Sequence, residues 1–87
     1  MAERDPEVEQ LEELVRFLAR ALVDEPDQVE VTALEAERGA VVVELAVAPD
    51  DLGKVIGREG RTARAIRTLL AASSSRLNRR AILEILE

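Results

Sequence analysis

The sequence predicts an α+β domain in which three helices cover one side of a three-stranded sheet, in the order α-β-β-α-α-β. Three patterns in its 87 residues lead to this prediction. An amphipathic helical pattern comes first, two alternating strand patterns follow, and two further helical segments flank a short loop that begins and ends with glycine. A chain of this length forms one modest core, so we expect residues 1–87 to be a single domain, with residues 1–7 as a flexible lead-in.

The first helix is predicted over residues 8–23. Apolar side chains recur there at intervals of three, four and seven residues and therefore share one face: Val8, Leu11, Leu14, Val15, Leu18, Ala19 and Leu22. Charged side chains are expected on the opposite face: Glu9, Glu12, Glu13, Arg16 and Arg20. Asp5 and Pro6 suit the helix start, since proline fits the first helical turn, and residues 24–27 end it.

Two strands are predicted next, over residues 29–35 and 40–47. In the first, apolar and polar residues alternate, and in the second one face carries Val41, Val43, Leu45 and Val47. The connection between them, residues 36–39, is polar and contains a glycine, so we expect a hairpin. Residues 81–87 are predicted to be a third, mostly buried strand, because a helix would scatter their apolar side chains around its whole circumference.

Two helices are predicted between the second and third strands. Asp50 is expected to cap a short helix over residues 51–56, and a helix of about 14 residues is expected from Arg61. One side of the longer helix is expected to be formed by Ala63, Ile66, Leu69, Leu70 and Ser73, and the other by Arg61, Arg64 and Arg67. The serines at 73–75 are expected to fray its end.

Charge is distributed unevenly along the chain. The net charge is −6, but residues 1–50 carry 4 basic and 14 acidic side chains, whereas residues 51–80 carry 8 basic and 2 acidic ones. Salt screens charges over about 10 Å, so a basic face on an acidic protein still attracts phosphate. The acidic balance therefore does not exclude a nucleic-acid ligand.

The segment Gly57-Arg58-Glu59-Gly60, here called the glycine loop, is the main candidate for a binding site. Glycine at both ends removes side chains and permits unusual backbone angles, so a sugar-phosphate chain can approach the main chain. The amides and dipole of the following helix favour an anion, and Lys54, Arg58 and Arg61 can add charge-assisted bonds. A G-x-x-G can also be a plain turn between helices. Apolar residues on both sides and the surrounding basic residues favour nucleic acid.

The stretch Gly53-Lys54-Val55-Ile56-Gly57-Arg58-Glu59-Gly60-Arg61-Thr62, continuing to Ala65-Ile66-Arg67, resembles the signature of the KH domain. The predicted order of elements resembles the type II, prokaryotic version of that domain. Because the resemblance covers nearly the whole chain, the chain is most similar to the KhpA family of small bacterial RNA-binding proteins. The resemblance implies a clamp for about four nucleotides of single-stranded RNA, and a post-transcriptional regulator or RNA chaperone.

The resemblance also implies which residues would contact RNA. The glycine loop, Gly57, Arg58, Glu59 and Gly60, would form a backbone clamp, and one side of the groove would be lined by Lys54, Val55, Arg61 and Arg64. The other side would be the second strand around Val42 and Glu44, with Arg38 in the position of the family's variable loop. Glu59 departs from the family pattern, in which both middle positions are often basic. Binding is therefore expected either to be weak or to depend on Arg61 and Arg64.

An enzyme is not expected, and neither is a cofactor or a metal site. The chain has no histidine and no cysteine, so the serines at 73–75 lack an activating base. Gly53-Lys54 does not belong to a P-loop motif, and Asp50-Asp51 suits helix capping better than metal binding. No signal peptide or membrane-spanning pattern is present, so we expect a cytoplasmic protein.

The alternative function is a protein-interaction module. The resemblance implies a possible homodimer and a possible larger KH-containing protein as partner. The helix around the glycine loop could be the contact surface, in which case dimerisation and RNA binding would compete. Arg76, Arg79 and Arg80 either extend the basic surface or pair with acids of the first helix.

Overall fold

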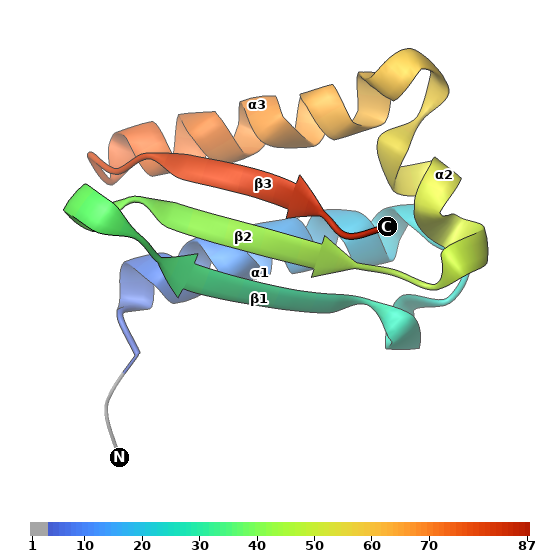
Figure 1. The fold of residues 1–87 in the computed structure, drawn as a ribbon, viewed down its shortest axis with the longest axis horizontal. Helices are drawn as coiled ribbons and strands as arrows, with labels where there is room; N and C mark the ends of the chain where they lie inside the picture. The colour runs from blue at the N-terminus through green and yellow to red at the C-terminus, as the bar shows by residue number, and fades with distance from the viewer. Residues whose placement is uncertain (1–3) are drawn as a thin grey trace.

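The computed structural model describes residues 4–87 and confirms the predicted order of elements (Figure 1). The helices and strands are α1 (Pro6–Leu22), β1 (Glu30–Glu35), β2 (Val41–Ala46), α2 (Leu52–Ile56), α3 (Arg61–Arg76) and β3 (Ala81–Ile85). Short 3-10 turns lie between them, including one at Glu37–Gly39 in the hairpin and one at Arg58–Gly60 in the glycine loop.

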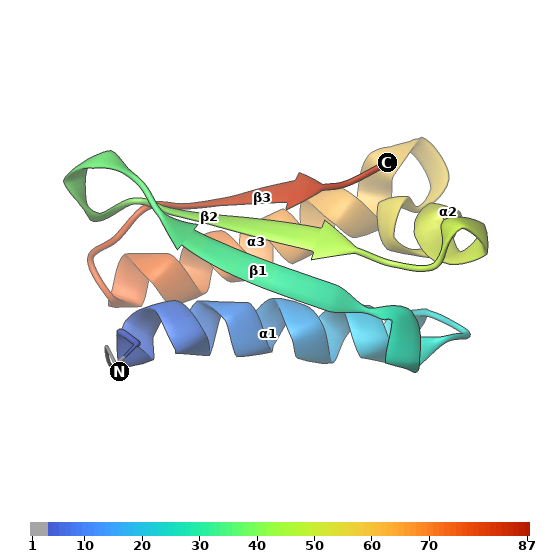
Figure 2. The same cartoon turned by 60° about the horizontal axis from the view of Figure 1, so that its bottom comes forward.

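The sheet has the order β1-β2-β3, with β1 antiparallel to β2 and β2 parallel to β3. The parallel pairing requires a long connection, because the chain must return to the same end of the sheet, and α2 and α3 make that crossover. Figure 2 shows α1 and α3 lying along the same side of the sheet, as predicted. The face turned away from the helices carries no helix of the described part of the chain.

The hydrophobic core lies between the sheet and the two long helices. Val41, Val43 and Leu45 of the central strand are fully buried, so the face that was predicted to carry these residues is the one that packs against the helices. They belong to one cluster with α1 residues such as Leu11 and Val15 and with the α3 residues Ile66 and Leu70. Each such side chain contributes roughly 1.5–3 kcal/mol by leaving water. The core therefore fixes the positions of the helices that flank the glycine loop.

Glu12, which was predicted on the charged side of the first helix, is nevertheless buried, with only 7% of its surface exposed. Its carboxylate forms ion pairs with Arg4 (3.0 Å) and Arg16 (2.9 Å) and accepts a hydrogen bond from the amide of Ala33 (3.2 Å). Ala33 lies in β1, which is an edge strand of the sheet. Edge strands leave main-chain groups without a partner strand, and Glu12 satisfies one of them.

Two leucines that were predicted to share the buried helix faces are partly outside the core. Leu69 of α3 is 49% exposed and Leu22 of α1 is 40% exposed. In α3, Ser74 lies in the buried face, and it is only 3% exposed. The predicted helical period was therefore correct, but the predicted apolar faces were wider than the faces that are buried.

The end of α3 is ordered, so the predicted fraying at residues 73–75 was wrong. The helix continues to Arg76, and the hydroxyl of Ser74 donates a hydrogen bond to the carbonyl of Ala71 (3.1 Å). The carbonyl of Ser74 accepts from the amides of Leu77 (3.0 Å) and Arg79 (2.9 Å). These bonds satisfy carbonyls that would otherwise be left free at a helix C-terminus.

The start of α1 is also more ordered than predicted. The helix begins at Pro6, and the carboxylate of Asp5 accepts a hydrogen bond from the amide of Glu7 (2.9 Å). Arg79 pairs with both acids, at 2.6 Å and 3.3 Å, and also with Glu35 of β1 (3.3 Å). Of the two roles left open for Arg79, the structural one is therefore confirmed. Of the predicted lead-in, residues 1–7, Asp5 is the cap of α1 and residues 6–7 form its first turn, whereas residues 1–3 lie outside the described residues.

The predicted cap of α2 was wrong as well. The residue at the N-cap position is Asp51, not Asp50, and no side chain makes a capping hydrogen bond there. Asp51 is only 2% exposed, and its carboxylate accepts hydrogen bonds from the amides of Asp24 (3.2 Å) and Glu25 (3.0 Å). It thus ties the turn after α1 to the start of α2.

Candidate nucleic-acid interface

The glycine loop requires glycine at position 57 for two reasons. The backbone of Gly57 has φ 77° and ψ 171°, which is strained for any residue with a side chain. A Cβ atom there would also lie 2.2 Å from the hydroxyl oxygen of Thr62. Close approach of the α3 start and the left-handed φ together exclude a side chain, so the loop surface stays bare at this position.

The other end of the loop is shaped by backbone angles alone. Gly60 has φ 74°, but an added Cβ would meet nothing within 4 Å. Its amide donates to the carbonyl of Gly57 (3.1 Å), which closes the turn. Glu59 also lies in the left-handed region, with φ 56° and ψ 26°, at a cost of roughly 1 kcal/mol. The side chains of Arg58 and Glu59 are both exposed.

The start of α3 presents positive charge. No side chain of the described residues makes a capping hydrogen bond at Gly60, so the positive end of the helix dipole is not offset by a side-chain cap. Arg61 and Arg64 on the first turns are exposed. Arg58 of the glycine loop is exposed as well, so three guanidinium groups in and just after the loop are available to an anion.

Lys54 is less available than the sequence suggested. Its ammonium group lies 3.3 Å from carboxylate oxygens of both Asp24 and Asp51. These contacts, the hydrogen bond to Asp24 first and that to Asp51 second, raise the pKa of Lys54 above its usual value. Burial alone would raise the pKa of Asp51, but the two backbone amides and Lys54 hold it below its usual value. The charge of Lys54 is thus largely matched by its acidic partners.

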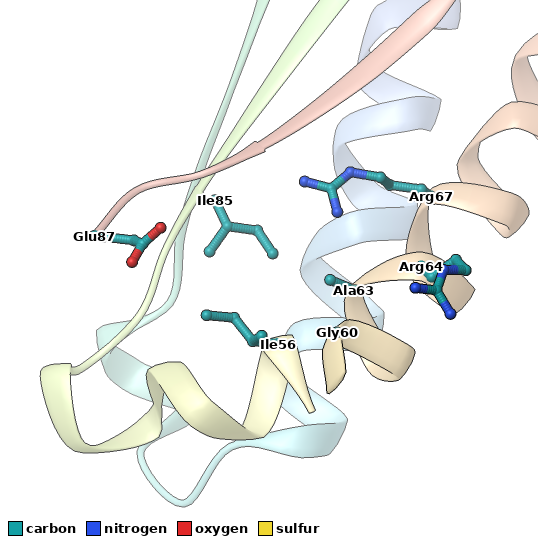
Figure 3. Close-up of a pocket in the computed structure, with 7 residues that line it drawn as sticks. All are labelled: Ile56, Gly60, Ala63, Arg64, Arg67, Ile85 and Glu87. Atoms are coloured by element: carbon teal, nitrogen blue, oxygen red, sulfur yellow. The ribbon is translucent and has the colours of Figure 1, made fainter. Parts of the chain in front are cut away.

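A hollow of about 390 Å³ opens beside the loop, between α3 and β3 (Figure 3). We call it the α3–β3 hollow, and its lining is Ile56, Gly60, Ala63, Arg64, Arg67, Ile85 and Glu87. In Figure 3, Arg67 extends toward β3, whereas Arg64 is directed away from it. The guanidinium of Arg67 donates to the carbonyl of Leu83 in β3, at 3.4 Å.

The structure brings some of the predicted contact residues together and separates others. The glycine loop, Arg61 and Arg64 lie around the start of α3. Val55 is fully buried in the core, and the neighbouring Ile56 reaches the hollow instead. Arg38 lies in the hairpin turn, at the opposite end of the sheet from α2 (Figure 1).

Val42 and Glu44 do not form the far wall of the α3–β3 hollow. They alternate with the buried residues of β2 and so lie on the sheet face turned away from the helices. The wall is formed by Ile85 and Glu87, at and after the end of β3. Sequence reasoning missed these two residues and the inward reach of Arg67. The signal that could have found them was the third predicted strand, over residues 81–87. Pairing it in parallel with the second strand would have placed it at the sheet edge beside α3.

No group of three or more His, Cys, Asp or Glu residues within 4–87 is arranged to hold a metal ion. In the same part of the chain, no helix has the length and apolar character needed to cross a bilayer.

A mixed three-stranded sheet, three helices in the order α-β-β-α-α-β and a G-x-x-G turn between α2 and α3 define a type II KH domain. The KH-domain model described as KhpA/KhpB matches residues 12–85. The chain belongs to the KhpA/KhpB family of KH domains.

Curated relatives match over most of the chain. The protein named RNA-binding protein KhpA of Caldanaerobacter subterraneus is 50% identical over 74 residues, which are 85% of this chain and 97% of the relative. The protein of the same name from Aquifex aeolicus is 51% identical over 77 residues, covering 88% of this chain and 96% of the relative.

Two solved structures of Era each contain a region with the same fold as this chain. Era of Aquifex aeolicus bound to GDP and aluminium fluoride has a TM-score of 0.65 and 16% identity, over 99% of this chain and 34% of Era. Era in complex with nucleotides 1506–1542 of 16S ribosomal RNA has a TM-score of 0.68 and 20% identity, over 98% of this chain and 32% of Era. At these identities the likeness concerns the fold alone.

Proposed function

We propose that this protein binds single-stranded RNA and holds about four nucleotides against the glycine loop and the α3–β3 hollow. The observation that carries the proposal is the bare, glycine-lined turn at the positive end of α3. Arg58 lies in this turn, Arg61 and Arg64 follow it on α3, and none of the three forms an ion pair within residues 4–87. The relatives named RNA-binding protein KhpA support the same function.

In this proposal the two parts of the site bind different parts of the nucleic acid. Phosphates lie against the glycine loop, where amides and arginines supply donors. Bases lie in the α3–β3 hollow, where Ile56, Ala63 and Ile85 supply apolar surface. Lys54 contributes little, because Asp24 and Asp51 already match its charge. A role as RNA chaperone or post-transcriptional regulator belongs to the same proposal.

We expect Arg58→Asp to reduce RNA affinity by roughly tenfold or more, without unfolding the protein. The side chain is exposed, so the change affects the field at the loop and not the core. Fluorescence anisotropy with mixed single-stranded RNAs at two salt concentrations measures the effect, and wild-type binding should weaken with salt.

Arg76→Asp is the matched control, because it makes the same charge change at the far end of α3. Glu59→Lys is the reciprocal variant and should strengthen binding, since it removes an acid beside the phosphates. If Arg58→Asp binds as tightly as Arg76→Asp, the glycine loop is not the site.

Self-association is a second candidate function, and the outer face of α3 favours it. Leu69 is 49% exposed and borders a shallow, mostly apolar hollow formed with Arg61, Arg64, Ala65 and Thr68. A second copy, or a larger KH-containing protein, seated there would cover Arg61 and Arg64. Self-association would then compete with RNA binding.

Sedimentation velocity with and without a short single-stranded RNA tests this second candidate. We expect a concentration-dependent dimer that RNA dissociates and that Leu69→Glu abolishes. Phe17→Glu is the control, since Phe17 is 71% exposed on α1. A monomer at high concentration, or a dimer unchanged by Leu69→Glu, argues against this surface.

A further inference from the structure

We propose that the α3–β3 hollow is a base pocket that selects guanine, with Arg67 and Glu87 reading different edges of the base. The inference rests on the proposed RNA binding and adds to it a class of nucleotide and two specificity-determining residues. Neither residue was among the predicted contacts, and neither belongs to the glycine loop.

The first observation is the position of Arg67. Its side chain extends from α3 to β3. The guanidinium donates one long hydrogen bond, 3.4 Å, to the carbonyl of Leu83. A guanidinium carries five N–H donors in a planar fork, so one such bond leaves most of them free. Arg67 forms no ion pair with any residue of 4–87. The bond to Leu83 therefore directs the exposed side chain across the hollow, and most of its donors remain for a ligand.

The second observation is the apolar surface between the two charged groups. Ile56 at the end of α2, Ala63 of α3 and Ile85 of β3 line the hollow, and Figure 3 shows Ile56 and Ile85 near one another. A flat heterocycle can cover these aliphatic groups without a hydrogen-bond partner on either face. The chain's single aromatic side chain, Phe17, is on α1, so stacking on an aromatic ring does not contribute here.

The third observation is Glu87, which lies beyond the end of β3 and lines the same hollow. It is exposed, and it has no ion pair among the described residues. An ionised carboxylate only accepts hydrogen bonds and can take two in parallel. The hollow thus offers donors from Arg67, acceptors from Glu87 and an apolar surface between them.

Guanine matches this arrangement better than the other bases. Its N7 and O6 are adjacent acceptors that suit an arginine fork, and its N1–H and 2-amino group are adjacent donors that suit a carboxylate. Adenine places its 6-amino donor next to N7, where it would face Arg67. Cytosine and uracil offer no pair of adjacent ring and amino donors to Glu87. If Arg67 instead bound phosphate, its loss would weaken all sequences equally.

Fluorescence anisotropy with short oligouridylates that carry one central guanine, adenine, inosine or 7-deazaguanine tests the pocket. We expect the guanine oligonucleotide to bind about tenfold more tightly than the adenine one. The inosine oligonucleotide lacks the 2-amino group, so it should bind wild type more weakly than the guanine oligonucleotide does. The two oligonucleotides should bind the Glu87→Gln variant with equal affinity. The 7-deazaguanine oligonucleotide lacks N7, so it should bind wild type more weakly than the guanine oligonucleotide does. This difference in affinity should disappear in Arg67→Ala.

Glu84→Gln and Arg76→Ala are the matched controls and should keep the guanine preference. Arg67→Lys keeps the charge but not the fork, and circular dichroism confirms that each variant is folded. Equal binding of all four oligonucleotides by wild type overturns the inference while leaving RNA binding intact. A guanine preference unchanged in Arg67→Ala and Glu87→Gln also overturns it. No binding of these oligonucleotides or of longer mixed RNA rejects the proposed function, and the pocket with it.

Discussion

Gly57→Ala is expected to destabilise the protein by about 2–4 kcal/mol and to abolish RNA binding. The new methyl group would have to share space with Thr62, whose hydroxyl oxygen would lie 2.2 Å from it. The amide of Thr62 would lie only 2.8 Å from the same atom, so rotation of the Thr62 side chain cannot relieve the contact. The start of α3 must therefore move away, and the donors around the glycine loop move with it.

Urea denaturation and anisotropy measure the two effects, and two other glycines serve as controls. Gly60→Ala meets no neighbouring atom but keeps a positive φ, so we expect a loss of only about 1 kcal/mol. Gly53→Ala lies in α2 with no contact and no positive φ, and should be neutral or stabilising by up to about 1 kcal/mol. If Gly57→Ala is no worse than Gly60→Ala, the contact with Thr62 does not shape the loop.

Glu12→Ala is expected to destabilise the protein by about 1–3 kcal/mol, because it leaves the β1 amide of Ala33 without its acceptor and removes the carboxylate that pairs with Arg4 and Arg16. For a domain of this size that corresponds to a fall in Tm of roughly 4–8 °C for each kcal/mol. Thermal melts followed by circular dichroism at neutral pH measure the difference. Glu13→Ala is the control, because the Glu13 side chain is 69% exposed and, among residues 4–87, its ion pair is with Arg16 alone.

The difference in stability between wild type and Glu12→Ala is expected to depend on pH. The hydrogen bond from Arg4 is the largest influence on the pKa of Glu12, and with Arg16 and the Ala33 amide it outweighs burial and holds the pKa below the usual 4.5. A carboxylate with a lowered pKa stabilises the folded state above its unfolded pKa and loses that effect as the pH falls through the folded value. Wild type and Glu12→Ala should therefore differ most near neutral pH and converge at acidic pH. A difference that is constant down to acidic pH would contradict this account.

The element order and the candidate site were predictable because their signals are local. The helical period of α1, the alternation in β2 and the glycine spacing between α2 and α3 each depend on residues close together in the chain. The same holds for the basic residues around the glycine loop. These patterns were sufficient to predict an α+β domain and a bare turn beside positive charge.

What local patterns could not decide were the partners supplied by distant segments. Lys54 lies in the predicted position, but Asp24, in the turn after α1, compensates its charge. Val42 and Glu44 have the predicted strand pattern. The parallel pairing of β3 with β2, however, puts β3 at the sheet edge beside α3, so the wall of the α3–β3 hollow comes from the end of β3.

Glu12 shows the physical reason most directly. By helical period it belongs to the polar side of α1, and the sequence by itself determined its place on that helix. The tertiary structure decided its environment, because an edge strand needs an acceptor for its free amide and α1 lies against β1. Sequence period fixes which way a side chain leaves its own element, whereas only the packing of elements determines which polar groups must find partners.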